Sequence, residues 1–184
     1  MTISQKHVLL VSGPAGVGKS TLSYEVAAQL RQDGLAHVVL DSDELDRVWP
    51  LSDSEQSELN RANLTAFWSN ATALGHIRLV LVGVFLDPDV NRLWIDAAVP
   101  NAKVTRVVLD ASDDELERRV MAREIGSGAG DQLTRTLIQA SQFRLRNAGS
   151  PDVLDANGAD VAELARQVIE RAGWIAATDD VERG

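Results

Sequence analysis

The sequence predicts an α/β protein with three layers, in which helices cover both faces of a parallel sheet. Apolar, strand-like runs alternate with longer helical patterns along the chain, and such alternation is typical of α/β folds. The strand-like runs are continuous stretches of valine and leucine, which indicates strands buried on both faces, as in a helix-covered parallel sheet. A glycine-rich turn directly follows the first run. In such folds ligands bind at the carboxyl ends of the strands, so this turn marks a candidate site.

The first strand and the first helix flank that turn. Residues 7–11 (HVLLV) form the strand, and the turn spans residues 12–18. A helix is predicted over residues 19–32 because leucine, valine and alanine recur there at spacings of three and four residues. Gly34 ends this helix.

The second and third strands enclose the longest predicted helix. Residues 37–40 (HVVL) form the second strand, with Asp41 at its carboxyl end. A helix is expected over residues 54–74, and residues 78–85 (RLVLVGVF) form the third strand, closed by an Asp-Pro turn. The residues expected on the apolar stripe of this helix are Leu59, Phe67, Ala71 and Leu74.

The remaining elements continue the alternation. A short helix is expected over residues 88–98 and the fourth strand over residues 103–109. The helix over residues 113–123 opens with three acidic residues, which the positive N-terminal end of a helix favours. After a glycine-rich stretch, the last elements are a helix over residues 133–147, a short strand over residues 152–154 and a helix over residues 160–174.

Length and composition exclude several classes of protein. The 184 residues carry 18 Lys and Arg against 27 Asp and Glu, a net charge of −9, and no cysteine. A chain of this length is a single domain, expected over residues 1–178 with a flexible tail at 179–184. The acidity disfavours nucleic acid or an anionic membrane as a constitutive partner, because both need a cationic surface. The lack of cysteine excludes disulfides, thiolate zinc sites and cysteine nucleophiles.

The apolar runs are too short to target or span a membrane. Residues 1–12 lack the apolar core and cleavage site of a signal peptide. The longest apolar run, residues 79–86, is far below the roughly 18–20 residues that a bilayer requires. We therefore expect a cytoplasmic protein.

Residues 13–20 fit the phosphate-loop pattern G-x-x-x-x-G-K-[ST]. Its glycines allow the backbone to curl so that successive N–H groups point at one anion. Lys19 supplies a mobile positive charge to the outer phosphates of a nucleotide, and Ser20 supplies a hydroxyl to Mg²⁺. The helix that begins there adds its positive end. The residues predicted to bind ATP are Gly13, Pro14, Ala15, Gly16, Val17, Gly18, Lys19, Ser20 and Thr21.

Two carboxylates follow the second strand. Asp41 and Asp43 lie at the carboxyl end of a buried run, the edge where a parallel sheet binds ligands. One carboxylate could hold Mg²⁺ while the other accepts a proton from an attacking hydroxyl. We expect Asp41 at the metal with Ser20, Asp43 as the base and both near the substrate, although the order of the two roles stays open. The alternative is that Ser42 or Asp43 caps a following helix.

The segment of residues 118–146 is rich in arginine. It carries six arginines against two acids, a local excess of four positive charges. Arg119 and Arg123 are four residues apart and therefore lie on one helix face. Guanidinium groups suit a transferring phosphoryl group, and the glycine-rich stretch favours a mobile lid over residues 124–134 whose closure would exclude water. For Arg118, a solvated face paired with nearby acids is the better interpretation.

Together these residues resemble the small P-loop kinases of the nucleoside-monophosphate-kinase-like superfamily, which includes gluconate, shikimate, adenylylsulfate and chloramphenicol kinases and the zeta toxins. The resemblance covers about residues 7–172 and rests on the 13–20 loop, Asp41-Ser42-Asp43 and Leu116-x-x-Arg119-x-x-x-Arg123. It implies the P-loop NTPase fold, with a five-stranded parallel sheet in the order 2-3-1-4-5. It further implies that Lys19 and Ser20 serve ATP and Mg²⁺, Asp43 the acceptor hydroxyl, and Arg119 and Arg123 the phosphates.

The choice of acceptor is expected to lie in residues 44–75, the insertion between the second and third strands. Arg47 could meet an anionic group, and Trp49, in a predicted loop beside a proline, could wall an organic substrate. Phe67 and Trp68 are better interpreted as core residues, because they share helical spacing with other apolar positions.

The function that these motifs predict is ATP-dependent transfer of a phosphoryl group to a hydroxyl of a small molecule. The alternative is a nucleotide-binding switch or a regulatory ATPase. A guanine-reading Asn-Lys-x-Asp motif is missing, because residues 101–104 read Asn-Ala-Lys-Val. The third strand also lacks the Asp-Glu ending of strand-type ATPases, so both observations favour the kinase. A third possibility is a protein that binds a phosphate other than a nucleotide.

Overall fold

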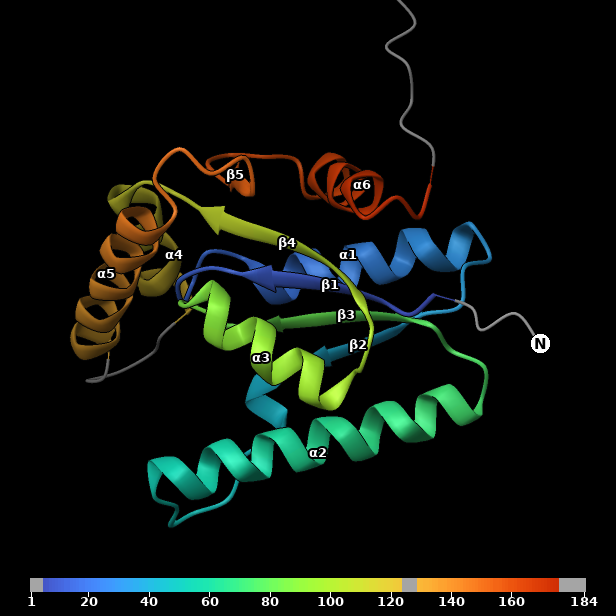
Figure 1. Ribbon diagram of the computed structural model, residues 1–184. Coiled ribbons are helices and arrows are strands. Elements are labelled where there is room, and N and C mark those ends of the chain that lie inside the picture. The colour runs from blue at the N-terminus through green and yellow to red at the C-terminus, as the bar shows by residue number, and fades with distance from the viewer. Residues whose placement is uncertain (1–4, 124–128, 176–184) are drawn as a thin grey trace, which may run out of the picture.

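The computed structural model describes residues 5–123 and 129–175 (Figure 1). The strands are β1 (His7–Ser12), β2 (Val38–Asp41), β3 (Arg78–Gly83), β4 (Lys103–Asp110) and β5 (Val153–Asp155). The helices are α1 (Lys19–Gln32), α2 (Asp53–Ala73), α3 (Pro88–Ala98), α4 (Asp113–Arg123), α5 (Ala129–Arg146) and α6 (Val161–Arg171), and the 3-10 turn η1 (Ser42–Glu44) follows β2.

The strands form one sheet in the order β2-β3-β1-β4-β5, and every adjacent pair is parallel. Helices α1 and α6 lie on one face of the sheet, and α2 and α3 lie on the other (Figure 1). The predicted three-layer α/β/α class and the strand order implied by the resemblance are therefore both confirmed.

The central strand β1 explains why the apolar runs are continuous. Leu9 and Val11 belong to the core shared with α1 and α6, whereas Val8 and Leu10 belong to the core shared with α2 and α3. All four side chains are buried. Because successive side chains of a strand point to opposite faces, a strand between two helical layers needs an apolar residue at every position.

The helix after the glycine-rich stretch begins earlier than predicted. The sequence pattern indicated a start at residue 133, but α5 begins at Ala129. Its first turn holds the polar residues Asp131 and Gln132, which carry no apolar periodicity. Asp131 instead suits the positive N-terminal end of the helix.

The predicted apolar stripe of α2 was right for Ala71, which is buried, and in part for Leu59, which is partly buried, but wrong for the other two residues. The buried residues of this helix are Leu64, Trp68 and Ala71, whereas Phe67 is 38% and Leu74 is 79% exposed. The core expectation is therefore confirmed for Trp68 and wrong for Phe67, which is exposed. A capping box between Ser52 and Glu55 fixes the start of α2, so the helix needs only a narrow apolar face to stay in place.

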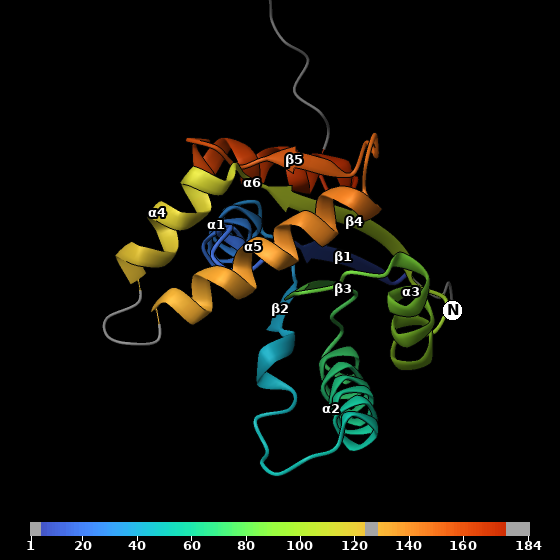
Figure 2. The same ribbon diagram turned by 90° about the vertical axis from the view of Figure 1, so that its left-hand side faces the viewer.

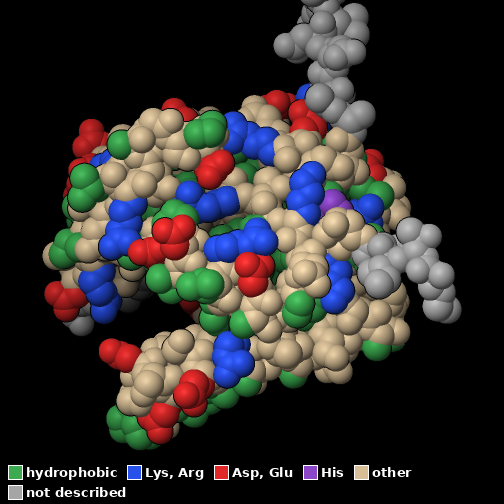
Figure 3. Space-filling view, in the orientation of Figure 1, with side chains coloured by type: hydrophobic (Ala, Val, Ile, Leu, Met, Phe, Trp, Pro, Cys, Tyr) green, Lys and Arg blue, Asp and Glu red, His purple; other side chains and the backbone are tan. Residues whose placement is uncertain are grey.

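The carboxyl ends of the strands lie between two projecting parts of the chain. Helices α4 and α5 lie on one side of this edge, and η1 with α2 lies on the other (Figure 2). The surface is deeply hollowed between the lower lobe formed around α2 and the helices above it (Figure 3). Within the described ranges, none of the helices is long and apolar enough to cross a membrane.

Candidate active site

The phosphate loop joins the end of β1 to the start of α1, as its motif predicted. Gly13 lies so close to the neighbouring strand that a Cβ atom at this position would clash with the carbonyl oxygen of Leu109, at a distance of 2.6 Å. Gly18 takes the N-cap position of α1 with a φ of 107°, which few residues other than glycine adopt. Glycine at these two positions permits the tight curve that the loop requires.

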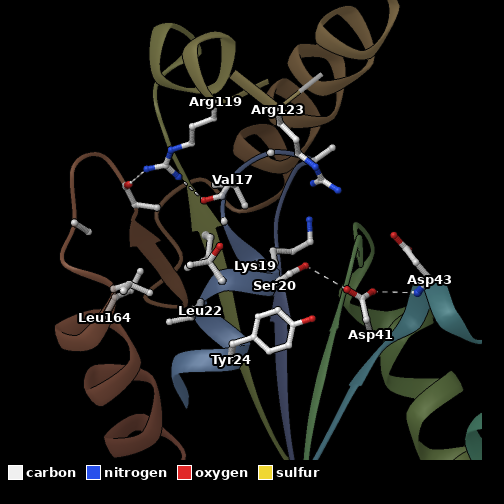
Figure 4. A pocket seen from close by; sticks show the side chains of 18 of the residues that line it. Val17, Lys19, Ser20, Leu22, Tyr24, Asp41, Asp43, Arg119, Arg123 and Leu164 are labelled. Atoms are coloured by element: carbon white, nitrogen blue, oxygen red, sulfur yellow. Dashed lines mark hydrogen bonds between the residues drawn. The ribbon is translucent and has the colours of Figure 1, made fainter. Parts of the chain in front are cut away.

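Lys19 lies inside this curve (Figure 4). Its Nζ atom donates hydrogen bonds to the carbonyl oxygens of Gly13 and Pro14, both at 2.9 Å. Burial lowers the pKa of Lys19 to about 8, and the carboxylates of Asp43 and Asp41 oppose this shift. The ammonium group is thus held between the loop carbonyls and the acidic pair, and it stays protonated at neutral pH.

The two predicted carboxylates lie beside the loop and make different contacts. Asp41 accepts a hydrogen bond from the Ser20 hydroxyl at 3.4 Å and another from the backbone N–H of Asp43 at 3.1 Å. The second bond makes Asp41 the N-cap of η1. The alternative interpretation, in which one of these residues caps a helical turn, is therefore correct for the turn. It is wrong for the residue, because the cap is Asp41 and not Ser42 or Asp43.

Asp43 projects from η1 toward the phosphate loop (Figure 4). Desolvation and the neighbouring Asp41 carboxylate raise the pKa of Asp43, and the charge of Lys19 partly offsets this rise. A raised pKa brings a carboxylate closer to the value that suits a general base near neutral pH.

The oxygen atoms beside the loop fit Mg²⁺. The Ser20 hydroxyl and the Asp41 carboxylate already lie in contact, and both are hard oxygen ligands of the kind that Mg²⁺ prefers. Among the described residues, His, Cys, Asp and Glu form no cluster of three or more that could hold a metal ion by itself. This donor set therefore matches an ion that keeps several waters and shares substrate phosphates.

Arg119 does not point freely into the cavity. Its guanidinium donates to the carbonyl oxygens of Val17 and Ala156 and to the Glu115 carboxylate, each at 2.6 Å. These contacts tie α4 to the phosphate loop and to the segment between β5 and α6 (Figure 4). Contacts with Arg118 and Arg119 lower the pKa of Glu115 to about 2. Arg119 is thus positioned as a clamp on the loop.

Arg123 is better placed to meet a phosphate. It is the last residue of α4, lines the cavity and points toward Lys19 (Figure 4). Its charge contributes to the lowered pKa of Lys19. Within the part of the chain that the structure describes, Arg123 makes no hydrogen bond or ion pair.

Three further arginines of this segment are paired with acids, as the alternative interpretation held for Arg118, whereas Arg135 donates a hydrogen bond to the side-chain oxygen of Gln132. Arg118 bonds Glu115, Arg144 bonds Asp110 and Asp113, and Arg146 bonds Asp87. The acids that pair with them precede residue 118 in the sequence, so the local charge excess overstated the positive field. Asp87 also caps α3.

One cavity of about 670 Å³ connects these groups. The phosphate loop, Asp41, Asp43, Glu44, Arg47, Arg119 and Arg123 contribute polar lining. Its other lining residues were missed by sequence reasoning and are Leu22, Tyr24, Leu109, Ala156, Ala159, Val161 and Leu164. Four of these follow β5, and the position of that segment after a parallel strand was the available signal.

The two predicted acceptor residues are placed differently. Arg47 lines the cavity and pairs with Glu44 at 2.5 Å. Trp49 is 91% exposed and is not among the residues that line this cavity in the described ranges. Residues 124–128 of the expected lid lie outside the described residues, and residues 129–134 form the first turns of α5.

A family model described as an AAA domain matches residues 8–148. The match takes in the phosphate loop, the acidic pair and both α4 arginines. The chain belongs to this AAA-domain family. A curated relative, the cytosolic Fe-S cluster assembly factor NUBP2 of Gallus gallus, is 31% identical over 118 residues, which is 61% of this chain. The AAA-domain chain spans 42% of the length of that relative.

Solved kinase structures share the fold of this AAA-domain chain. The APS kinase CysC of Mycobacterium tuberculosis, in complex with AMPPNP and APS, has a TM-score of 0.60 and 22% identity, covering 92% of this chain and 98% of that one. A gluconokinase of Sinorhizobium meliloti 1021 has a TM-score of 0.57 and 18% identity, covering 92% and 93%. The fold that the kinase resemblance implied is therefore confirmed.

The Arg119 clamp leads to a stability prediction. Replacing Arg119 with alanine leaves the Val17 and Ala156 carbonyls without their charged donor, so we expect a loss of about 1.5–3 kcal/mol in the free energy of unfolding. Denaturant titration measures this loss. Arg118→Ala is the matched control, because that side chain shares Glu115 but is 68% exposed, and exposed pairs contribute little. Equal effects of the two variants would refute the clamp.

Proposed function

We propose that this protein transfers the γ-phosphate of ATP to a hydroxyl of a small-molecule acceptor. The observation that supports this most is the meeting in one cavity of a phosphate loop, a carboxylate pair and Arg123, an arginine that is unpaired among the residues that the structure describes. A nucleotide-binding protein needs only the first of these. A carboxylate beside the outer-phosphate lysine is the group that a hydroxyl acceptor requires in order to lose its proton.

The residues divide the work of such a transfer. The loop N–H groups and Lys19 hold the phosphates, and Arg123 would offset charge that develops on the transferring group. The acceptor oxygen forms a bond to the γ-phosphorus, the bond to the leaving ADP oxygen breaks, and Asp43 takes the acceptor proton. Ser20 and Asp41 would hold Mg²⁺, which supplies charge neutralisation at the phosphates when bound.

The cavity also suggests how the two substrates are arranged. The nucleoside would lie along the less polar end, between Tyr24, Ala156 and Leu164. The acceptor would enter past η1 and residues 44–75, where Arg47 lies. The structural neighbours named as acting on gluconate or APS support a small, hydroxyl-bearing acceptor. We also propose a cytoplasmic location, which the name of the curated relative, a cytosolic factor, supports.

A nucleotide-dependent assembly or regulatory ATPase is the second candidate function. The partial likeness to an Fe-S cluster assembly factor favours it. In that case the protein would bind and hydrolyse ATP without an acceptor, and Asp43 would orient water.

The two functions are separated by incubating the protein with ATP, Mg²⁺ and a panel of sugars, nucleosides, antibiotics and amino acids. A kinase releases ADP at a rate that depends on one class of acceptor. Tight ATP binding with an ADP release rate that no acceptor alters would support the ATPase instead.

The lowered pKa of Lys19 leads to a pH prediction for ATP binding. Bound phosphates favour the charged form of Lys19 and therefore raise its pKa again. Above the pKa of the free protein Lys19 is neutral, so ATP binding must then be accompanied by uptake of a proton. We expect a flat dissociation constant up to about pH 7.5, and a rise approaching tenfold per pH unit above the pKa of about 8. Calorimetry between pH 7 and 9.5 measures this. Lys19→Arg should lose the dependence, because arginine stays charged, and a slope that persists in that variant would rule out Lys19.

A further inference from the structure

One side chain outside the predicted site bonds directly to the phosphate loop. Gln139 of α5 accepts, through Oε1, a hydrogen bond from the backbone N–H of Ala15 at 3.0 Å. The two residues are 124 positions apart in the sequence. The bond occupies one of the N–H groups with which such a loop cradles phosphates.

Helix α5 holds Gln139 firmly in this position. Thr136, Ala140 and Phe143 lie on the buried face of the helix, with exposed fractions of at most 1%. Gln139 borders that face, one position before Ala140, and is itself partly buried. The contact with Ala15 therefore follows from the packing of the helix and does not depend on a loosely held surface side chain.

The Ala15 N–H lies at the outer-phosphate end of the loop. The Lys19 ammonium bonds the carbonyl oxygens of Gly13 and Pro14, the two residues immediately before Ala15. In a phosphate loop the lysine serves the outermost phosphates, while the N–H groups at the helix start hold the inner ones. Because Ala15 directly follows the two residues that Lys19 contacts, we assign its N–H to the outer phosphates.

We propose that the Gln139 carboxamide oxygen occupies the place of a γ-phosphate oxygen on the Ala15 N–H, and that it makes the loop discriminate between nucleoside triphosphates and diphosphates. The inference rests on the proposed nucleotide function. A triphosphate must displace Gln139 from Ala15 in order to bind fully. A diphosphate leaves the contact intact. Gln139 thus acts as a specificity-determining residue that links occupation of the outer phosphate position to helix α5.

The test compares the dissociation constants of ADP and of the β,γ-imido analogue of ATP by calorimetry. Gln139→Leu removes the competing acceptor, and we expect the analogue to bind about five times more tightly, the equivalent of one neutral hydrogen bond. Gln139→Glu places a charged acceptor on the same N–H, and we expect the analogue to bind at least about tenfold more weakly. ADP should change less than about twofold in the leucine variant.

Gln167→Leu is the matched control, because among the described residues this exposed glutamine bonds Glu163 of its own helix α6 and lies outside the cavity lining. It should leave both constants unchanged. Equal shifts of both nucleotides, or none, in the Gln139 variants would overturn the inference while leaving the proposed function standing. A wild-type protein that binds neither nucleotide would contradict both. Thermal melts of each variant establish that the protein compared is folded.

Discussion

Replacement of Lys19 by alanine is expected to lower acceptor-dependent turnover by a factor of about 10²–10³. The variant removes the mobile positive charge nearest the outer phosphates, and loss of one such group in a water-excluded site costs about 10²–10³ in rate. The loop also loses the ammonium that bridges the Gly13 and Pro14 carbonyls. Steady-state ADP release and ATP binding should both be measured, because both should fall.

Lys103→Ala provides the control for this result. Lys103 is an exposed lysine at the start of β4, at the opposite end of the sheet from the loop. Its loss should leave turnover within about twofold of the wild type, as for most surface substitutions. Normal turnover in the Lys19 variant would show that the phosphate loop does not serve the reaction.

Asp43→Asn is expected to lower kcat by about 10²–10⁴, the range for loss of a positioned general base. Asparagine keeps the size of the side chain but cannot accept the acceptor proton as a carboxylate does. The dissociation constant of ATP should change less than about threefold, because Asp43 lies on η1 beside the loop and is not part of it. Single-turnover kinetics together with equilibrium binding separates these two effects.

Asp41→Asn is the matched comparison, since it makes the same change two residues earlier. Asp41 contacts Ser20, so we expect its loss to raise the Mg²⁺ concentration needed for half-maximal activity. A parallel loss of ATP binding and turnover in the Asp43 variant would count against its role as base. If the Mg²⁺ requirement rose in the Asp43 variant and not in the Asp41 variant, Asp43 would be the metal ligand and Asp41 the base.

The phosphate loop and the acidic pair could be predicted because each is a local pattern. The glycines, Lys19 and Ser20 of the loop lie within eight consecutive residues. The local backbone geometry alone therefore brings them around one phosphate site. Asp41 was placed by the end of an apolar strand. A parallel sheet brings such ends to one edge whatever the helices do, so no distant contact was needed to find it.

The role of Arg119 could not be read in the same way. Helical spacing put Arg119 and Arg123 on one face, and the sequence assigned both to phosphates. Two of the groups that hold Arg119 are carbonyls of Val17 and Ala156, which lie 102 and 37 residues away. Every residue has a backbone carbonyl oxygen, so the sequence does not show which carbonyls an arginine contacts. An arginine that holds the loop and an arginine that binds a phosphate therefore cannot be distinguished from the sequence.

Packing between elements accounts for the other differences. The acids that neutralise the arginine-rich segment come from the end of β4, the first turn of α4 and the loop before α3. On α2, the sequence pattern favoured Leu74, but the chain leaves the core at Ala71 and Leu74 stays exposed. Gln139 carries no apolar or charged signal, and only the docking of α5 brings it to the loop.

The fate of the γ-phosphate separates a kinase from an ATPase. The protein is incubated with ATP labelled in the γ-phosphate, Mg²⁺ and the acceptor that most stimulates ADP release, and phosphorylated acceptor and inorganic phosphate are both quantified. The proposed function predicts that phosphorylated acceptor matches the ADP formed and that Asp43→Asn lowers this yield. Label recovered only as inorganic phosphate, at a rate independent of any acceptor, would contradict it.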